Sequence, residues 1–194
     1  MATPARKPAT YADLLGLPEQ TRAEILAGEI VVAPAPLPRH SKAQGAIRRF
    51  VGGPYDDDDG HGGPGGWWIF EVDVALSRED VVRPDVAGWR RARLLQPGSK
   101  RPIEIVPDWV CEVLSPATAA RDRVQKRALY ARAGVGHYWI VDPEARVLEA
   151  LTLREGNWLE QGVYDESATA RIAPFDDVTI DVGRLFLPRD ADNP

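Results

Sequence analysis

The chain has 194 residues, of which 44% are apolar and 27% are charged, and its formal net charge at neutral pH is −5. This length is typical of a single domain, and the composition is that of a folded protein rather than a disordered one. No stretch approaches the roughly 18 apolar residues of a membrane span, and Pro4 and Pro8 interrupt the start of the chain. We therefore expect no signal peptide, no membrane association and a cytoplasmic location.

The first third of the chain predicts small elements around a proline-rich connection. Residues 1–10 are expected to form a flexible arm, 11–187 a single domain and 188–194 a tail. A short helix over 11–17 is followed by two strands, over 23–26 and 29–33, which can form a hairpin. Prolines at 34, 36 and 38 favour irregular chain, so the next helix is expected to begin at Ser41.

The rest of the chain predicts a sheet with helices packed on it. A polar, glycine-rich segment over 55–66 is expected to be an exposed loop. Apolar patterns predict strands over 67–76, 81–89, 109–114 and 137–141. They also predict a helix over 117–133. A hairpin over 147–153 and 158–164 and one further strand over 178–182 follow. This order predicts an α/β fold, a mixed central sheet flanked by helices, with added N-terminal and C-terminal hairpins.

Several common functional motifs are excluded. The glycines between positions 60 and 65 match the letters of a dinucleotide-binding motif, but a strand rather than a helix is expected to follow them. Cys111 alternates with Trp109 and Val113 on one strand face, so a core thiol is expected. One cysteine and three widely separated histidines predict neither a disulfide nor a zinc site.

Two acidic residues interrupt apolar strands. Asp85 follows a proline within the run 81–89, and Glu112 shares a strand face with Val110 and Leu114. Carboxylates are almost never buried unpaired, so each position predicts either a charged partner or a functional site. The alternative for Asp85 is a solvent-facing position on an edge strand, and the alternative for Glu112 is a salt bridge to an arginine.

The helix that follows carries a polar stripe. Asp122, Lys126 and Tyr130 are spaced by four residues, and a helix returning along the sheet can point Lys126 at Glu112. The alternative is a surface ion pair between Asp122 and Lys126. Two carboxylates and an ammonium suit Mg²⁺ and an attacking water, because hard cations take oxygen ligands and lower the pKa of bound water. The lysine can stabilise developing negative charge, so these residues predict phosphodiester hydrolysis.

The same residues belong to a longer pattern. It consists of Pro84-Asp85, Glu112-Val113-Leu114-Ser115-Pro116, Asp122 with Lys126 and Tyr130, Gly134-Val135 and Tyr138-Trp139-Ile140-Val141-Asp142-Pro143. Weaker matches occur at Glu24-Ile25, Gly28-Glu29 and His40. The pattern resembles the Uma-two family, a bacterial family of restriction-endonuclease-like proteins in the PD-(D/E)xK nuclease superfamily.

The resemblance implies a restriction-endonuclease-like fold and an endonuclease that depends on Mg²⁺ or Mn²⁺. The metal ligands that it implies are Asp85, Glu112 and the backbone carbonyl of Val113. It implies Lys126 as the catalytic, water-orienting residue, with His40 and Glu29 as further candidates beside the site. The superfamily name implies a lysine two residues after the glutamate. That position is Leu114 in this chain, and Lys126 is the matching residue.

The distribution of charged residues along the chain indicates which kind of molecule the protein could bind. The net negative charge argues against nucleic acid, yet basic residues gather in three clusters, over 39–49, 83–101 and 121–132. We expect these clusters to flank one cleft, away from the acidic run 56–59, and the partner to be nucleic acid, specifically DNA. A homodimer is left open. The alternatives are a catalytically silent nucleic-acid-binding or protein-interaction module on the same fold, or an acidic protein whose basic clusters never converge.

Overall fold

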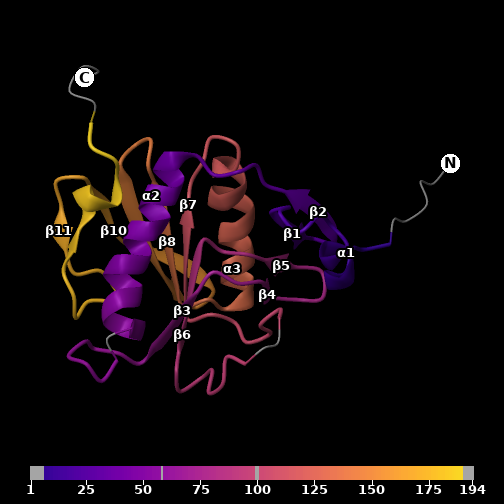
Figure 1. Cartoon of the computed structure of the whole chain (residues 1–194), viewed down its shortest axis with the longest axis horizontal. Coiled ribbons are helices and arrows are strands. Elements are labelled where there is room, and N and C mark those ends of the chain that lie inside the picture. The colour runs from indigo at the N-terminus through magenta and orange to yellow at the C-terminus, as the bar shows by residue number, and fades with distance from the viewer. Residues whose placement is uncertain (1–6, 58, 99–100, 190–194) are drawn as a thin grey trace.

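The computed structural model describes residues 7–57, 59–98 and 101–189, so parts of the expected arm and tail lie outside it. A six-stranded sheet with the order β10-β9-β8-β7-β6-β3 forms the centre (Figure 1). Its strands are β3 (Trp67–Phe70), β6 (Val86–Arg90), β7 (Trp109–Val113), β8 (His137–Asp142), β9 (Val147–Arg154) and β10 (Asn157–Asp165). The pair β7 and β8 is parallel, and the other neighbouring pairs are antiparallel. The predicted mixed α/β fold is confirmed.

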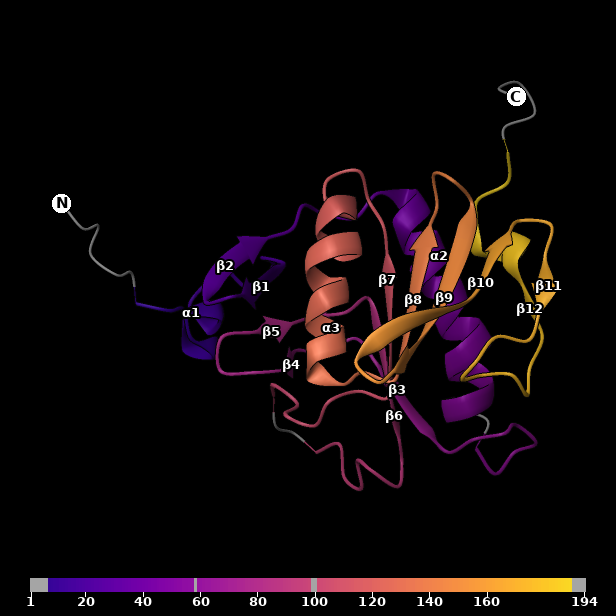
Figure 2. The ribbon, with the colours of Figure 1, turned by 180° about the vertical axis from the view of Figure 1, so that it is seen from behind.

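Helices cover both faces of this sheet. On one face lies α2 (Pro38–Ile47), which continues into the π-helical segment η1 (Arg48–Asp57). On the other face, η2 (Arg121–Lys126), also π-helical, leads into α3 (Arg127–Ala133), as Figures 1 and 2 show from opposite sides. The second helical run connects β7 to β8, because parallel neighbours require a long crossover. No helix in the described ranges is long and apolar enough to cross a bilayer.

The alternation of side chains along β7 separates two cores. Trp109, Cys111 and Val113 pack in the cluster beneath α2, which confirms Cys111 as a core thiol. Val110 belongs to the cluster beneath α3. Glu112 lies between Cys111 and Val113, so its side chain falls on the α3 side, where the preceding η2 carries Lys126.

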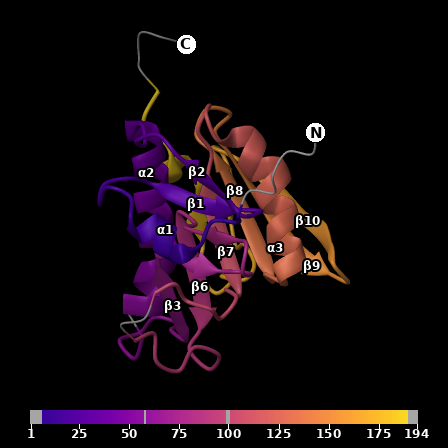
Figure 3. The ribbon, with the colours of Figure 1, turned by 90° about the vertical axis from the view of Figure 1, so that its right-hand side faces the viewer.

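A second, smaller sheet with the order β2-β1-β5-β4 lies at one side of the molecule, next to α3 (Figure 3). It consists of β1 (Ala23–Leu26), β2 (Glu29–Val32), β4 (Val74–Ala75) and β5 (Val81–Val82), and α1 (Tyr11–Leu15) precedes it. The predicted β1–β2 hairpin is confirmed. Ala27 and Gly28 both have positive φ, at 52° and 76°, as a two-residue hairpin turn requires.

The predicted strands over 67–76 and 81–89 are wrong in extent, because each is divided between the two sheets. β3 pairs with β6 in the large sheet, and β4 pairs with β5 in the small one. The break between β5 and β6 falls at Arg83-Pro84-Asp85, where proline cannot donate a ladder hydrogen bond. Asp85 is therefore not inside a strand. It lies at a bend directly before β6, and its neighbour Val86 is paired with Cys111.

Three further boundaries differ from expectation. α2 begins at Pro38 rather than Ser41, because proline fits the first position of a helix. The segment from Tyr55 to Asp57 is helical rather than loop, with Tyr55 buried in the core. The strand expected over 178–182 is reduced to β12 (Ile180–Asp181), which pairs with β11 (Thr169–Ala170) and leads into the 3₁₀ helix η3 (Val182–Leu185).

An aromatic cluster fills the core beneath α2. The ring of Phe175 lies 4.8 Å, between centroids, from each of the rings of Tyr55, Trp67 and Trp109. Trp139 lies 5.6 Å away from Phe175 in an edge-on arrangement. Since these rings come from helix, strands and the C-terminal segment, they fix the large sheet against η1 and the C-terminal segment.

Gly88 of β6 should be intolerant of a side chain. A Cβ at this position would come within 3.0 Å of Ile69 and Trp109 and 3.3 Å of Trp67, in the packed aromatic core. We expect Gly88→Ala to lower the free energy of unfolding by about 1–3 kcal/mol, measured by urea denaturation. The control is Gly45→Ala in α2, where a Cβ meets nothing within 4 Å. There alanine should stabilise by about 0.5–1 kcal/mol. Equal effects of the two substitutions would contradict this packing argument.

Candidate functional site

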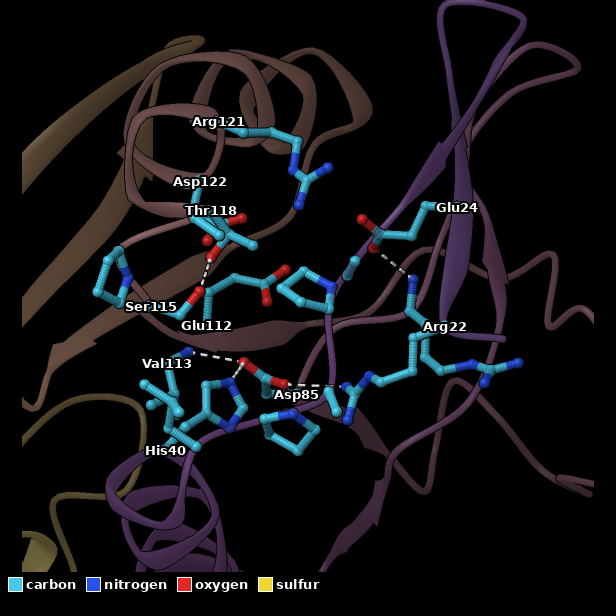
Figure 4. A pocket seen from close by; sticks show the side chains of 18 of the residues that line it. Arg22, Glu24, His40, Asp85, Glu112, Val113, Ser115, Thr118, Arg121 and Asp122 are labelled. Atoms are coloured by element: carbon cyan, nitrogen blue, oxygen red, sulfur yellow. Dashed lines mark hydrogen bonds and ion pairs between the residues drawn. The ribbon is translucent and has the colours of Figure 1, made fainter. Parts of the chain in front are cut away.

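A cavity of about 270 Å³ lies where the small sheet meets β7 and η2 (Figure 4). Its walls come from β1, the segment 33–37, the start of α2, the bend before β6, the end of β7 and η2. Its ionisable lining residues are Arg22, Glu24, His40, Arg83, Asp85, Glu112, Arg121, Asp122 and Lys126. Residues far apart in the sequence therefore meet here.

Asp85 is held in place by contacts from three other segments. The backbone N–H of Val113 donates to its Oδ2 over 2.8 Å, and Nε2 of His40 lies 3.1 Å from the same oxygen. A terminal nitrogen of Arg22 lies 3.3 Å from Oδ1. Asp85 is only 5% exposed, so the solvent-facing alternative for this residue is wrong.

Glu112 and Lys126 form the centre of a second group. Lys126 Nζ lies 2.9 Å from Oε1 of Glu112, 2.8 Å from Oε1 of Glu24 and 3.7 Å from Oδ1 of Asp122. The hydroxyl of Tyr130 donates to the same oxygen of Glu112. The side chains of Lys126 and its three acidic neighbours are all buried. The alternative interpretation, a surface ion pair between Asp122 and Lys126, is therefore wrong. Glu112 is paired with a lysine rather than an arginine.

Burial and crowding of carboxylates shift the pKa values in this second group. Burial raises the pKa of Glu112 to about 8, against the opposing effect of Lys126, with contributions from Asp122, Asp85 and Glu24. Burial likewise raises the pKa of Asp122. For Lys126 burial acts in the opposite direction, but the surrounding carboxylates outweigh it and raise the pKa. The ammonium of Lys126 therefore stays charged. The raised pKa of Glu112 means that its carboxylate can bind a proton near neutral pH, or could bind another cation in its place.

The structure brings most of the sequence-predicted site residues together. Asp85, Glu112, Lys126 and His40 all line the cavity. Val113 lines it too, and its contact with Asp85 is made through the amide rather than through the carbonyl expected to bind metal. Their catalytic and metal-binding roles stay predictions.

The prediction that Glu29 lies beside the site is wrong, and Glu24 was not identified from the sequence as a contact of Lys126. Glu29 is exposed on β2, whereas Glu24 of β1 lies in the cavity, 2.8 Å from Lys126, and accepts the N–H of Arg83. A signal for Glu24 was present in the sequence. Like Glu112, it is a lone acid within a strand whose other residues are apolar and buried.

The donor chemistry of the cavity suits a hard divalent cation. Four buried carboxylates, Glu24, Asp85, Glu112 and Asp122, line the cavity together with one buried ammonium. The pKa of Glu112 is raised mainly by burial and also by its acidic neighbours, and an added cation would offset both effects. Among residues 7–57, 59–98 and 101–189, no group of three or more His, Cys, Asp or Glu side chains is arranged to hold an ion. Mg²⁺ usually keeps several waters and takes one or two protein carboxylates with substrate phosphates, so two carboxylates suffice.

Few members of the three predicted basic clusters lie at this cavity. From these clusters only Arg83, Arg121 and Lys126 are among the cavity's lining residues, within the described chain. Other members are neutralised nearby, as Arg91 is by Asp56 and Arg123 is by acids on β8 and β9. The basic clusters therefore contribute only three side chains to the lining of this cavity within the described chain.

Comparison with known proteins identifies the class of fold first. The structure matches a crystal structure from Anabaena variabilis ATCC 29413, described as a putative nuclease belonging to DUF820, with a TM-score of 0.73 and 20% identity. The match covers 92% of this chain and 98% of the other, and it shows that the two share a fold. No curated protein matches the chain.

The family follows from the sequence itself. Residues 8–183 match the Uma2 (Uma-two) family, which is described as "Putative restriction endonuclease". This match spans most of the 194 residues, so the chain belongs to that family, and the resemblance noted from its motifs is confirmed.

Glu112→Gln should remove a pH dependence of stability. Burial raises the pKa of Glu112 from 4.5 to about 8, so between these values the folded state binds the proton more tightly than the unfolded state. The stabilisation linked to this group is therefore present at low pH and is lost as pH rises through about 8. We expect Glu112→Gln, compared with wild type by urea denaturation in EDTA, to gain relative stability progressively from about pH 5 to pH 8.

The exposed Glu29→Gln serves as the control for this measurement and should show no such trend. If the difference between Glu112→Gln and wild type were constant across the same pH range, the raised pKa of Glu112 would be refuted.

Proposed function

We propose that the protein is a cytoplasmic, metal-dependent endonuclease that hydrolyses phosphodiester bonds of DNA, with Mg²⁺ or Mn²⁺ as its cofactor. The observation that carries the proposal is the meeting of Asp85, Glu112 and Lys126, from three separate segments, in one cavity. Membership of a family described as restriction endonucleases supports it.

The carboxylates of Asp85 and Glu112 would hold the metal ion, with the carbonyl of Val113 as the third protein ligand. When bound, the ion would neutralise charge on the phosphate and lower the pKa of the attacking water. The chain prepares these ligands before any ion binds. The Val113 amide and His40 orient Asp85, and Lys126 favours the ionised form of Glu112. In this proposal His40 is a positioning residue.

Lys126 would act by its charge and by donating hydrogen bonds. Its raised pKa keeps it protonated, so it cannot serve as a general base. Of its three acidic neighbours, Asp122 is the most distant, at 3.7 Å, and is the contact most easily exchanged for a water or a phosphate oxygen. An ammonium in this position can orient the nucleophile and stabilise the negative charge that develops in the transition state.

A catalytically silent module that binds nucleic acid is the second candidate. It is favoured by the existing pairing of the acids, since Asp85 already contacts His40 and Arg22, and Lys126 bridges its neighbours. Tight binding of Mn²⁺ without cleavage of any DNA would support this candidate over the first.

Asp85→Asn and Glu112→Gln should each abolish binding of Mn²⁺ measured by isothermal titration calorimetry. Each substitution keeps the shape of the side chain and removes one ligand charge, and it also relieves repulsion in the metal-free protein. Glu29→Gln, which changes an exposed carboxylate outside the cavity, should bind Mn²⁺ like wild type. Unchanged affinity in both cavity variants would refute the assignment of these residues as metal ligands.

Lys126→Gln should lose cleavage but keep binding of metal and DNA. Removing an electrostatic contact made in the transition state commonly slows a reaction by about a hundredfold to a thousandfold. The assay is nicking of supercoiled plasmid with Mg²⁺ or Mn²⁺, and circular dichroism verifies folding because the substitution leaves buried acids unpaired. Lys42→Gln, at an exposed position of α2, is the matched control. Equal cleavage by wild type and Lys126→Gln would reduce Lys126 to a structural partner of Glu112, and no cleavage by wild type would refute the endonuclease proposal.

A further inference from the structure

One cationic side chain of the cavity is left without a partner. Arg22 pairs with Glu71 and Asp85, Arg83 pairs with Asp73, and Lys126 is surrounded by carboxylates. Arg121, at the start of η2, makes no ion pair within the part of the chain that the structure describes. Figure 4 shows its side chain extending from the helix into the cavity.

The guanidinium of Arg121 also contains a buried donor that is not satisfied. Its Nε is buried and has no hydrogen-bond partner among the described residues. Buried N–H groups are nearly always paired, so an unpaired one in a residue that lines a cavity calls for an acceptor such as a water or a ligand. Since guanidinium carries only donors, the missing partner must be an acceptor, and its planar fork matches the oxygens of a phosphate.

Two hydroxyl groups lie on the same side of the cavity. Ser115 and Thr118 both line it, and their oxygens are 3.0 Å apart, in the turn that leads to Arg121. Hydroxyls can donate to phosphate oxygens alongside arginine, and the hydroxyl of Thr118, which contacts the carboxylate of Asp122, would exchange that acceptor for a phosphate oxygen. The carboxylates of the cavity would repel a phosphate, and the charge of Lys126 is already shared among them. Arg121 is therefore the lining cation whose charge is available to an incoming anion.

We infer that Arg121, with Ser115 and Thr118 beside it, forms a phosphate-binding subsite that holds a backbone phosphate of the nucleic acid. The subsite is separate from the carboxylates proposed to bind metal, because Arg121 pairs with none of them in the described structure. The inference rests on the proposed function to the extent that nucleic acid must enter this cavity. It adds a residue that sets the position of the substrate strand.

The test measures how DNA binding depends on salt. Fluorescence anisotropy of a labelled duplex is recorded in EDTA, so that no cleavage occurs, for wild type, Arg121→Gln, Arg121→Lys and Arg132→Gln. Arg132 is an exposed arginine further along the same helical run and is not a lining residue of the cavity. Neutralising one phosphate contact should reduce the slope of log K against log salt by about 0.9. Arg121→Lys keeps the positive charge, so the slope of log K against log salt should stay the same. This variant should bind DNA more weakly, because lysine lacks the planar guanidinium.

The inference is overturned by an unchanged slope in Arg121→Gln, by an equal loss in Arg132→Gln, or by the absence of salt-dependent DNA binding in wild type. Circular dichroism of each variant separates loss of contact from loss of fold. The plasmid-nicking assay is independent of this measurement. A protein that binds DNA with an Arg121-dependent slope but nicks no plasmid would refute hydrolysis and leave the phosphate subsite in place.

Discussion

One buried ammonium joins three parts of the molecule. Lys126 of η2 contacts Glu24 of the small sheet and Glu112 of the large sheet, and all three side chains are almost fully buried. Interior carboxylates without such a partner would be strongly destabilising, so the hairpin β1–β2 and the helix must close over β7 together. The cavity lies where irregular segments, 33–37, the bend at Asp85 and the turn 115–118, meet this ion-pair group. A structural requirement and a candidate site thus depend on the same side chain.

The single ammonium of Lys126 does not fully balance the charge of its acidic neighbours Glu24, Glu112 and Asp122. A fully compensated salt-bridge network would hold Glu112 ionised at neutral pH, whereas burial raises the pKa of Glu112 to about 8 and also raises the pKa of Asp122. The interior therefore contains more acid than its ammonium can neutralise, and either a bound proton or, under the proposed function, a metal ion would balance it. Stability alone would favour apolar residues at such positions, since a buried ion pair is seldom better than good packing. The buried acids therefore fit the proposed function better than a purely stabilising role.

The sequence predicted what depends on local periodicity. The period of two placed Glu112 opposite Trp109 and Cys111 across β7, and the spacing of four placed Lys126 toward it. The division of strands between two sheets was not predicted, because an apolar run does not specify which partner it pairs with, although Pro84 marked the break. The sequence also did not predict which charged residues far apart in the chain form ion pairs. Arg91 follows β6 and meets Asp56 of η1, because β6 lies beside β3 and Asp56 accepts the N–H of Ile69 in β3. Such contacts neutralise members of the apparent basic clusters.

The position of the lysine follows from the same geometry. A residue two places after Glu112 falls on the same face of β7, and here it is Leu114, which packs in the apolar core beneath α3. A charged side chain there would enter that core, and its removal from water would not be offset. The helix above this face can instead supply an ammonium from its own polar stripe, and Lys126 reaches Glu112 from η2 at 2.9 Å. The π-helical turn sets both Asp122 and Lys126 on the inner side, which agrees with the frequent occurrence of such turns at functional sites. An ammonium supplied by the helix therefore meets the acid of β7 while Leu114 stays in the apolar core beneath α3.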